Sequence, residues 1–146
     1  MDRRPLDLDR DLNRVLSMQR RSWEINFPGQ AFFEGAFVGS LRGGVRRGQL
    51  YAYESEGHLV GWLWLDLSIP RIGGHIRHIQ VAEPYWGRGI GRAIVEDAIA
   101  LCREKGCPEL TLNVTKSNSR ALALYTSLGF QLKQDDGDRQ KMSLAL

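Results

Sequence analysis

The chain has 146 residues and a mass of 16.5 kDa, a length that suits one compact domain, 1–146. Hydrophobic residues make up 42% and charged residues 25% of the chain, which excludes disordered, collagen-like and mucin-like proteins. The longest apolar run, residues 59–65, is far shorter than the roughly 18 to 20 residues of a membrane span, and the charged N-terminus lacks the apolar core of a signal peptide. We therefore expect a cytoplasmic protein with no membrane partner.

The charge balance bears on nucleic-acid binding, and the cysteines bear on metal sites and disulfides. Lys and Arg number 20 and Asp and Glu 17, which gives a net charge of +3 and a pI near 9.1. This small excess supports nucleic-acid binding only weakly, because the sequence has no long basic run and no recognition-helix or RNA-binding pattern. Cys102 and Cys107 are too few for a zinc site or a disulfide framework, so we expect reduced packing residues and no metal.

The first half of the chain shows helical patterns followed by strand patterns. Its predicted elements are helices over 6–27 and 33–43, then strands over 49–55, 58–67 and 76–81. Pro28-Gly29 separates the helices, Gly43-Gly44 ends the second, and Glu56-Gly57 turns the first two strands into a hairpin. The expectation is therefore two helices followed by three antiparallel strands.

The second half returns to helices between strands. Its predicted elements are a helix over 90–106, a strand over 110–115, a helix over 119–128 and a hairpin of 130–133 with 141–146. Gly129 has the residue type of a left-handed helix C-terminal cap. This order of elements predicts an α+β fold with a mixed sheet.

Residues 81–92 join a strand end, a glycine-rich turn and a helix start. Glycine at alternate positions lets the backbone approach a ligand and directs several N–H groups the same way at a helix N-terminus. Arg88 and Arg92 flank the turn and suit a diphosphate. The segment therefore predicts an anion site, with a plain connection carrying solvated arginines as the alternative.

Two better-known phosphate motifs fail at this turn. A dinucleotide fingerprint would need its third glycine at position 92 or 94, which hold Arg92 and Ile94. A Walker A loop would need Gly-Lys-Ser/Thr after the turn, and none follows. The Rossmann and P-loop interpretations therefore fail on spacing.

A second constellation, N-x-x-A-x-x-x-Y-x-x-x-G-F, runs from Asn118 to Phe130. Together with Trp-Gly-Arg-Gly-Ile-Gly at 86–91, it resembles the GNAT superfamily of acyl-CoA-dependent N-acyltransferases, from about His58 to the C-terminus. The family carries Q/R-x-x-G-x-G/A at the turn, so Trp86 departs from its first position. The resemblance implies a mixed, mostly antiparallel central sheet flanked by helices, with a splayed pair of central strands. It also implies acceptor-side helices over 1–50 and an acetyl-CoA-binding core with a C-terminal hairpin over 51–146.

The same resemblance implies acetyl-CoA as the cosubstrate. The backbone of the turn would hold the diphosphate, and the pantetheine arm would pair with the strand before it as an added strand. The residues implied to bind the cofactor are Ile79, Gln80, Val81, Trp86, Gly87, Arg88, Gly89, Ile90, Gly91, Arg92, Asn118 and Tyr125.

The family also implies direct attack of a neutral amine on the thioester. Tyr125 matches its general acid, which protonates the leaving thiolate, with a packed aromatic as the alternative role. His75 stands six residues before Val81, at the position where several members carry a Glu that acts as the general base. An imidazole is mostly neutral at pH 7.5, so His75 is the candidate base. Water, His78 and an acceptor-side glutamate are the alternatives.

The acceptor side is open. Asn113 stands where some members that acetylate protein N-termini carry Glu, which disfavours a ribosomal-protein substrate. Residues 23–37 hold several aromatics with Glu24 and Glu34, which suit a cationic amine or the edge of a core. We expect acetyl transfer to a primary amine of a small molecule or protein. A non-catalytic acyl-CoA-binding domain and a nucleic-acid-binding module are the alternatives, and a homodimer stays open.

Overall fold

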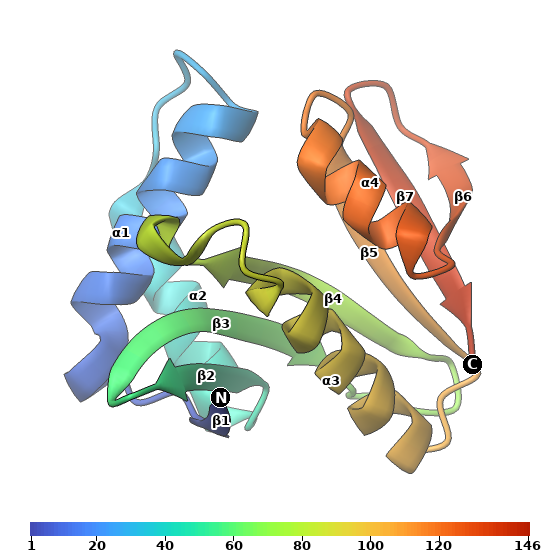
Figure 1. The fold of residues 1–146 in the computed structure, drawn as a ribbon, viewed down its shortest axis with the longest axis horizontal. Helices are drawn as coiled ribbons and strands as arrows, with labels where there is room; N and C mark the ends of the chain where they lie inside the picture. The colour runs from blue at the N-terminus through green and yellow to red at the C-terminus, as the bar shows by residue number, and fades with distance from the viewer. The chain divides into compact units, whose positions relative to one another are not determined.

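The computed structural model describes residues 1–146 (Figure 1). In chain order its elements are β1 (Asp2–Pro5), α1 (Leu8–Asn26), α2 (Glu34–Arg46), β2 (Leu50–Ser55), β3 (His58–Asp66), β4 (Gly74–Val81), the 3-10 turn η1 (Glu83–Tyr85), α3 (Ile90–Glu104), β5 (Glu109–Thr115), α4 (Ser119–Ser127), β6 (Gln131–Asp135) and β7 (Arg139–Ala145). The seven strands form one sheet in the order β1-β2-β3-β4-β5-β7-β6. The β4–β5 pair is parallel, whereas the β1–β2, β2–β3, β5–β7 and β6–β7 pairs are antiparallel. The predicted α+β class with a mixed, mostly antiparallel sheet is confirmed.

Two compact units divide the chain, and each is described by itself. The first unit comprises Met1–Trp64 and His78–Ile94, and the second comprises Leu65–Arg77 and Val95–Leu146. The single domain expected from the length, with its division at residue 50, stays a prediction. None of the helices is both long enough and apolar enough to cross a membrane.

The core of the first unit lies where α1 and α2 pack on β2 and β3. Apolar side chains recurring every three or four residues in the helices meet alternate residues of the strands. Trp62 and Trp64 are fully buried, and their indole N–H groups donate to Gln80 Oε1 at 2.7 Å and Gln49 Oε1 at 3.0 Å. The two largest core side chains are thereby buried with their donors paired.

The sequence analysis missed β1, which adds a fourth antiparallel strand on the edge of β2. Two guanidinium nitrogens of Arg4 donate to the buried Asp11 carboxylate at 2.7 Å each. The Nε of Arg4 donates to Glu54 at 2.7 Å. Burial alone would raise the pKa of Asp11, but the hydrogen bonds and charge of Arg4 lower it below its ordinary value. A charged segment without alternating apolar residues therefore becomes a strand through partners distant in sequence.

The second helix also differs from its expected end. It continues through Gly43 and Gly44 to Arg46. A Cβ on Gly44 would lie 2.9 Å from the Trp64 ring, so this glycine permits close packing of α2 on the core. Glycine was expected to end the helix, but here it serves packing inside it.

In the second unit, the start of β4 packs tightly against the end of α3. Gly74 opposes Leu110 of β5, and a Cβ on Gly74 would lie 2.5 Å from Cys102 Sγ. Beyond Cys102, Gly106 has φ +73, and the N–H of Cys107 donates to the Cys102 carbonyl at 3.0 Å, which closes a Schellman cap. Both cysteines are buried and free, and burial raises the pKa of the Cys102 thiol to about 12.

Candidate functional site

The turn before α3 lies in the first unit and keeps its backbone open. Gly87 and Gly89 have φ of +76 and +77, and no heavy atom lies within 4 Å of where a Cβ would stand on either. The Ala93 N–H donates to the Gly89 carbonyl at 3.1 Å, at the first turn of the helix. Because the first N–H groups of any helix lack intrahelical acceptors, this turn presents backbone donors beside open space.

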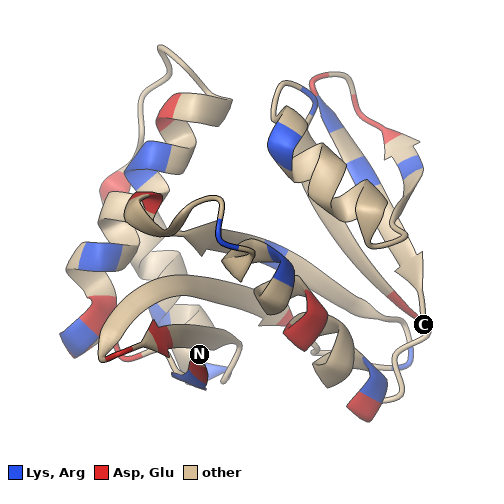
Figure 2. Ribbon diagram, viewed as in Figure 1, with Lys and Arg blue, Asp and Glu red and all other residues tan.

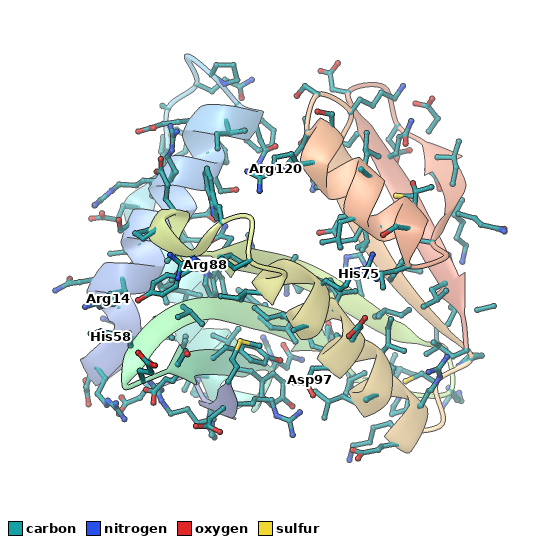
Figure 3. All side chains as sticks on the ribbon, viewed as in Figure 1. Arg14, His58, His75, Arg88, Asp97 and Arg120 are labelled. Carbon is teal, nitrogen blue, oxygen red and sulfur yellow. The ribbon has the colours of Figure 1, made fainter.

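Basic residues lie along the chain at this turn and at the start of α3 (Figure 2). Arg88, labelled in Figure 3, places its guanidinium over the Tyr85 ring at 5.4 Å from the centroid. Arg92 stands in the first turn of α3. The helix N-terminus and the two guanidinium groups all favour an anion here.

Trp86, at the position where the family carries Gln or Arg, contacts the end of β4. Its indole N–H donates to the Val81 carbonyl at 2.7 Å. The Arg21 guanidinium lies over the Trp86 ring at 5.9 Å and its Nε donates to Glu83 at 3.0 Å. Trp86 therefore ties the turn to β4, while Arg21 ties it to α1.

The end of β4 is held by β3 and α1. The Gln80 side chain accepts from Trp62 and donates to Gln19, so its amide group already has partners. The Ala82 N–H donates to the Val60 carbonyl at 2.8 Å, just past the strand. A ligand at Ile79, Gln80 and Val81 would therefore be bound mainly by backbone groups.

His75, labelled in Figure 3, lies in the second unit at the start of β4. Its Nδ1 is 2.7 Å from Thr111 Oγ1, the residue opposite it in β5. The Thr111 hydroxyl also donates to the Gly74 carbonyl at 3.3 Å. Gly74 faces Cys102 of α3, so His75, the next residue of the strand, points to the other face.

Burial is the main cause that lowers the pKa of His75 below its ordinary value. The positive charges of Lys141, Arg77 and Arg139 lower it further, whereas Asp66 raises it. The imidazole is therefore neutral at pH 7 and able to accept a proton.

His78, the alternative base, sits in the first unit among aromatic rings. It stacks on Trp62 with ring centroids 5.4 Å apart, and it lies 5.7 Å from both Trp64 and Phe37. The half-buried His78 ring therefore packs against aromatic side chains of α2 and β3.

Tyr125 and Asn118 belong to the second unit. Tyr125 is only 7% exposed and packs against Phe130 with ring centroids 5.8 Å apart. Burial raises the pKa of Tyr125 to about 12, so its phenol stays protonated at neutral pH. Asn118 accepts from the Ala121 N–H at 3.2 Å and caps α4.

The aromatic segment between α1 and α2 forms a chain of rings. Trp23 lies 4.5 Å from Phe27 and 5.7 Å from Phe32, which in turn lies 5.7 Å from Phe37. The two glutamates of this segment are paired, Glu24 with Arg21 and Glu34 with Arg20. Both carboxylates therefore already have cationic partners.

Nowhere do three or more His, Cys, Asp or Glu side chains group so that they could hold a metal ion.

Comparison with known proteins decides the family. The sequence model of the Acetyltransferase (GNAT) family matches residues 12–130. The chain belongs to this family. Over 57 residues, this chain is 49% identical to the N-alpha-acetyltransferase MAK3 of Arabidopsis thaliana. The match covers 39% of this chain and 30% of that protein. A putative ribosomal protein bS18-alanine N-acetyltransferase of Bacillus subtilis is 32% identical over 80 residues, 53% of this chain and 50% of that protein.

The fold agrees with a solved GNAT structure. The PaiA N-acetyltransferase of Thermoplasma acidophilum, in complex with coenzyme A, superposes with a TM-score of 0.82 at 20% identity, over 99% of this chain and 98% of that one. At this identity the likeness shows the fold alone. The matched segments of the Arabidopsis and Bacillus relatives cover less than two thirds of those proteins.

Within this GNAT chain, the predicted residues fall into two groups. The first unit brings together Ile79, Gln80 and Val81 with the turn at 86–92, whereas the second contains His75, Asn118 and Tyr125. Sequence reasoning missed Arg21 and Thr111. The sequence marked Thr111 only as a polar residue in an alternating strand. No sequence pattern predicted its pairing with His75.

Proposed function

We propose that this chain is an N-acetyltransferase that moves the acetyl group of acetyl-CoA to a primary amine of a small molecule or a protein. The observation that carries the proposal is the turn from Gly87 to Arg92, with its open space and backbone donors. Membership in the GNAT family and relatives named N-acetyltransferases support it. The turn would bind the diphosphate, and the backbone of Ile79, Gln80 and Val81 would pair with the pantetheine arm.

The chemistry is direct transfer. The amine nitrogen forms a bond to the thioester carbonyl carbon, and the carbon–sulfur bond breaks. His75 accepts the proton that the amine loses, and Tyr125 gives its phenolic proton to the departing thiolate. The neutral imidazole and the protonated phenol are the forms that these roles need at pH 7. A backbone N–H of β4 near Val81 polarises the carbonyl, and Asn118 helps to hold the pantetheine arm.

The acceptor is an amine reached from the aromatic segment between α1 and α2. Glu24 and Glu34 are paired with arginines, so a cationic acceptor would have to compete with those partners. The rings of Trp23, Phe27 and Phe32 therefore supply the main attraction, through apolar and cation–π contact. Asn113 in place of a Glu leaves the base role to His75 or water.

The wider setting is part of the same proposal. We infer a cytoplasmic enzyme of one acetyltransferase domain, with acceptor-side helices over 1–50 and a cofactor-binding core over 51–146. Acetyl-CoA is the only cosubstrate proposed besides the amine, and no step is assigned to a metal. Neither a membrane nor a nucleic acid is proposed as a partner, and a homodimer is compatible with these roles.

A thiol-release assay tests this function. The protein is incubated with acetyl-CoA and with peptides that begin with alanine or methionine, an aminosugar phosphate or a polyamine. We expect free thiol to appear only with a suitable amine, one thiol per acetylated product detected by mass spectrometry. Coenzyme A binding without thiol release from any amine would favour a sensing domain. Salt-sensitive retention on DNA, unaffected by coenzyme A, would favour a nucleic-acid-binding module.

A further inference from the structure

The hydroxyl of Thr111 lies between two groups of β4. Thr111 is 8% exposed, and its Oγ1 lies 2.7 Å from His75 Nδ1 and 3.3 Å from the Gly74 carbonyl oxygen. A buried hydroxyl needs partners, because leaving it unpaired costs free energy. Here both partners belong to the two residues that open β4.

Counting hydrogens limits these bonds to two arrangements, of which only one gives the Gly74 carbonyl the Thr111 hydroxyl as a donor. A threonine hydroxyl has one hydrogen, and the carbonyl of Gly74 can only accept it. With that hydrogen donated to Gly74, Oγ1 is left to accept from His75, so Nδ1 carries the imidazole hydrogen. In the reverse arrangement the hydroxyl would donate to Nδ1, and the Gly74 carbonyl would lose this donor.

The tautomer decides which nitrogen can act as a base. A neutral imidazole has one N–H and one unprotonated nitrogen, so hydrogen on Nδ1 leaves the lone pair on Nε2. The charged groups around the ring are Lys141 and Arg139 of β7, Arg77 of β4 and Asp66 at the end of β3. Their net effect, with burial, keeps the ring neutral, but it does not choose between the two nitrogens. That choice falls to Thr111.

We propose that Thr111 is a positioning residue that holds His75 as the Nδ1–H tautomer and thereby presents Nε2 as the proton acceptor. This inference rests on the proposed function for the use made of Nε2, but the tautomer itself exists without any substrate. Thr111 can take this role because the register of β4 on β5 places it directly opposite His75. Thr111 touches no reacting atom and acts only through His75.

Nitrogen NMR tests the tautomer directly. The chain has three histidines, so the His75 signals are assigned by their loss in His75→Gln. We expect Nδ1 of His75 to show the chemical shift of a protonated nitrogen and Nε2 that of an unprotonated one at pH 8. Thr111→Val keeps the shape and removes the hydroxyl, and it should give a mixture of tautomers or the Nε2–H form. Thr111→Ser should keep the wild-type pattern.

Thr115→Val is the matched control, because Thr115 lies on the same face of β5, four residues on, and pairs with Arg139. It should leave the His75 signals unchanged. A wild-type Nε2–H form, or Thr111→Val that keeps the wild-type pattern while remaining folded, would overturn the inference. If Thr111→Val does not fold, Thr111→Ser and the wild-type spectrum still decide it.

Activity separates this inference from the proposed function. With the most active amine of the panel, Thr111→Val should lower kcat/KM about tenfold. The fall of kcat/KM at acidic pH should also shift to lower pH in Thr111→Val, because the lost Oγ1 acceptor no longer stabilises the His75 imidazolium. Thr111→Ser should restore both. If the NMR pattern changes as expected while His75→Gln keeps full activity, the positioning role stands and the base role of His75 fails.

Discussion

The two units of the chain carry different kinds of candidate functional group. In the first unit the turn at Gly87 and Gly89 presents backbone, with no neighbour near the missing side chains. In the second unit His75 and Tyr125 are side chains whose pKa values burial has moved, one down and the other up. Exposed backbone donors suit recognition of a charged ligand, whereas buried titratable groups suit proton transfer. In the proposed function, the turn of the first unit would therefore bind the diphosphate, whereas His75 and Tyr125 of the second unit would transfer protons.

The strongest test of this division is Tyr125→Phe. The change keeps the ring against Phe130 and removes only the hydroxyl. We expect kcat to fall by roughly ten- to a thousandfold, with coenzyme A affinity little changed, because the proton donor is lost and the binding groups remain. Steady-state kinetics and calorimetry measure the two effects. Tyr53→Phe, at a buried tyrosine of the first unit, is the control, and an unaltered kcat in Tyr125→Phe would leave Tyr125 as a packing residue.

Gly74→Ala tests the close packing in the second unit. The added methyl would stand 2.5 Å from Cys102 Sγ and 3.0 Å from Leu67 Cδ2. We expect the free energy of unfolding to fall by about 1–3 kcal/mol, as for overpacked cores, in urea denaturation followed by circular dichroism. Gly39→Ala is the control, because a Cβ there meets nothing within 4 Å. Equal stability of Gly74→Ala and the wild type would contradict the packing described for β4.

Gly89→Val tests the binding role of the first unit. A branched side chain would fill the open space at the turn and oppose the φ of +77. We expect coenzyme A affinity to fall at least about tenfold in calorimetry, because the diphosphate could not approach the backbone. Gly48→Val is a matched control, since Gly48 has φ +68 and equally open surroundings at the end of α2. If both variants bind coenzyme A as the wild type does, the diphosphate lies elsewhere.

Both units contain elements that the sequence could predict and features that it could not. Local patterns were enough for α1, α3, α4 and the strands β2 to β7, and for the glycine turn, whose conformation depends on adjacent residues. The strand β1 was missed because its partners, Asp11 and Glu54, are remote in sequence. The Gly44 position was misjudged because a glycine that admits Trp64 looks the same in sequence as one that ends a helix.

The chemistry of the second unit was the hardest to predict. The bond between His75 and Thr111 depends on the register of β4 on β5, which no local pattern sets. The same holds for His78, which is three residues away and lies among aromatic rings. Two histidines in one strand therefore have different environments for reasons that only tertiary packing supplies.

His75→Ala tests whether the neutral imidazole is the base. We expect kcat/KM to fall about tenfold and to lose the acid limb that the wild type shows as pH drops through the His75 pKa, below 6.5. The limb has this sign because protonation removes the acceptor. His58→Ala, at an exposed histidine that opens β3, is the control for surface effects. A variant that keeps both rate and limb would move the role to water.

The smallest expected effect is on stability between pH 8 and 5. Burial and nearby cations lower the pKa of folded His75, so the unfolded chain takes up this proton first as pH falls. Between the unfolded pKa, near 6.5, and the folded pKa, the unfolded state binds more protons, and the free energy of unfolding must decrease with falling pH. Urea denaturation at pH 8 and pH 5 should therefore show a larger loss for the wild type than for His75→Gln. The carboxylates with lowered pKa values, such as Asp11 and Glu109, are shared by both proteins and cancel in the comparison. Equal losses would mean that His75 titrates alike in the folded and unfolded chains, which would contradict the lowering of its pKa by burial and nearby cations.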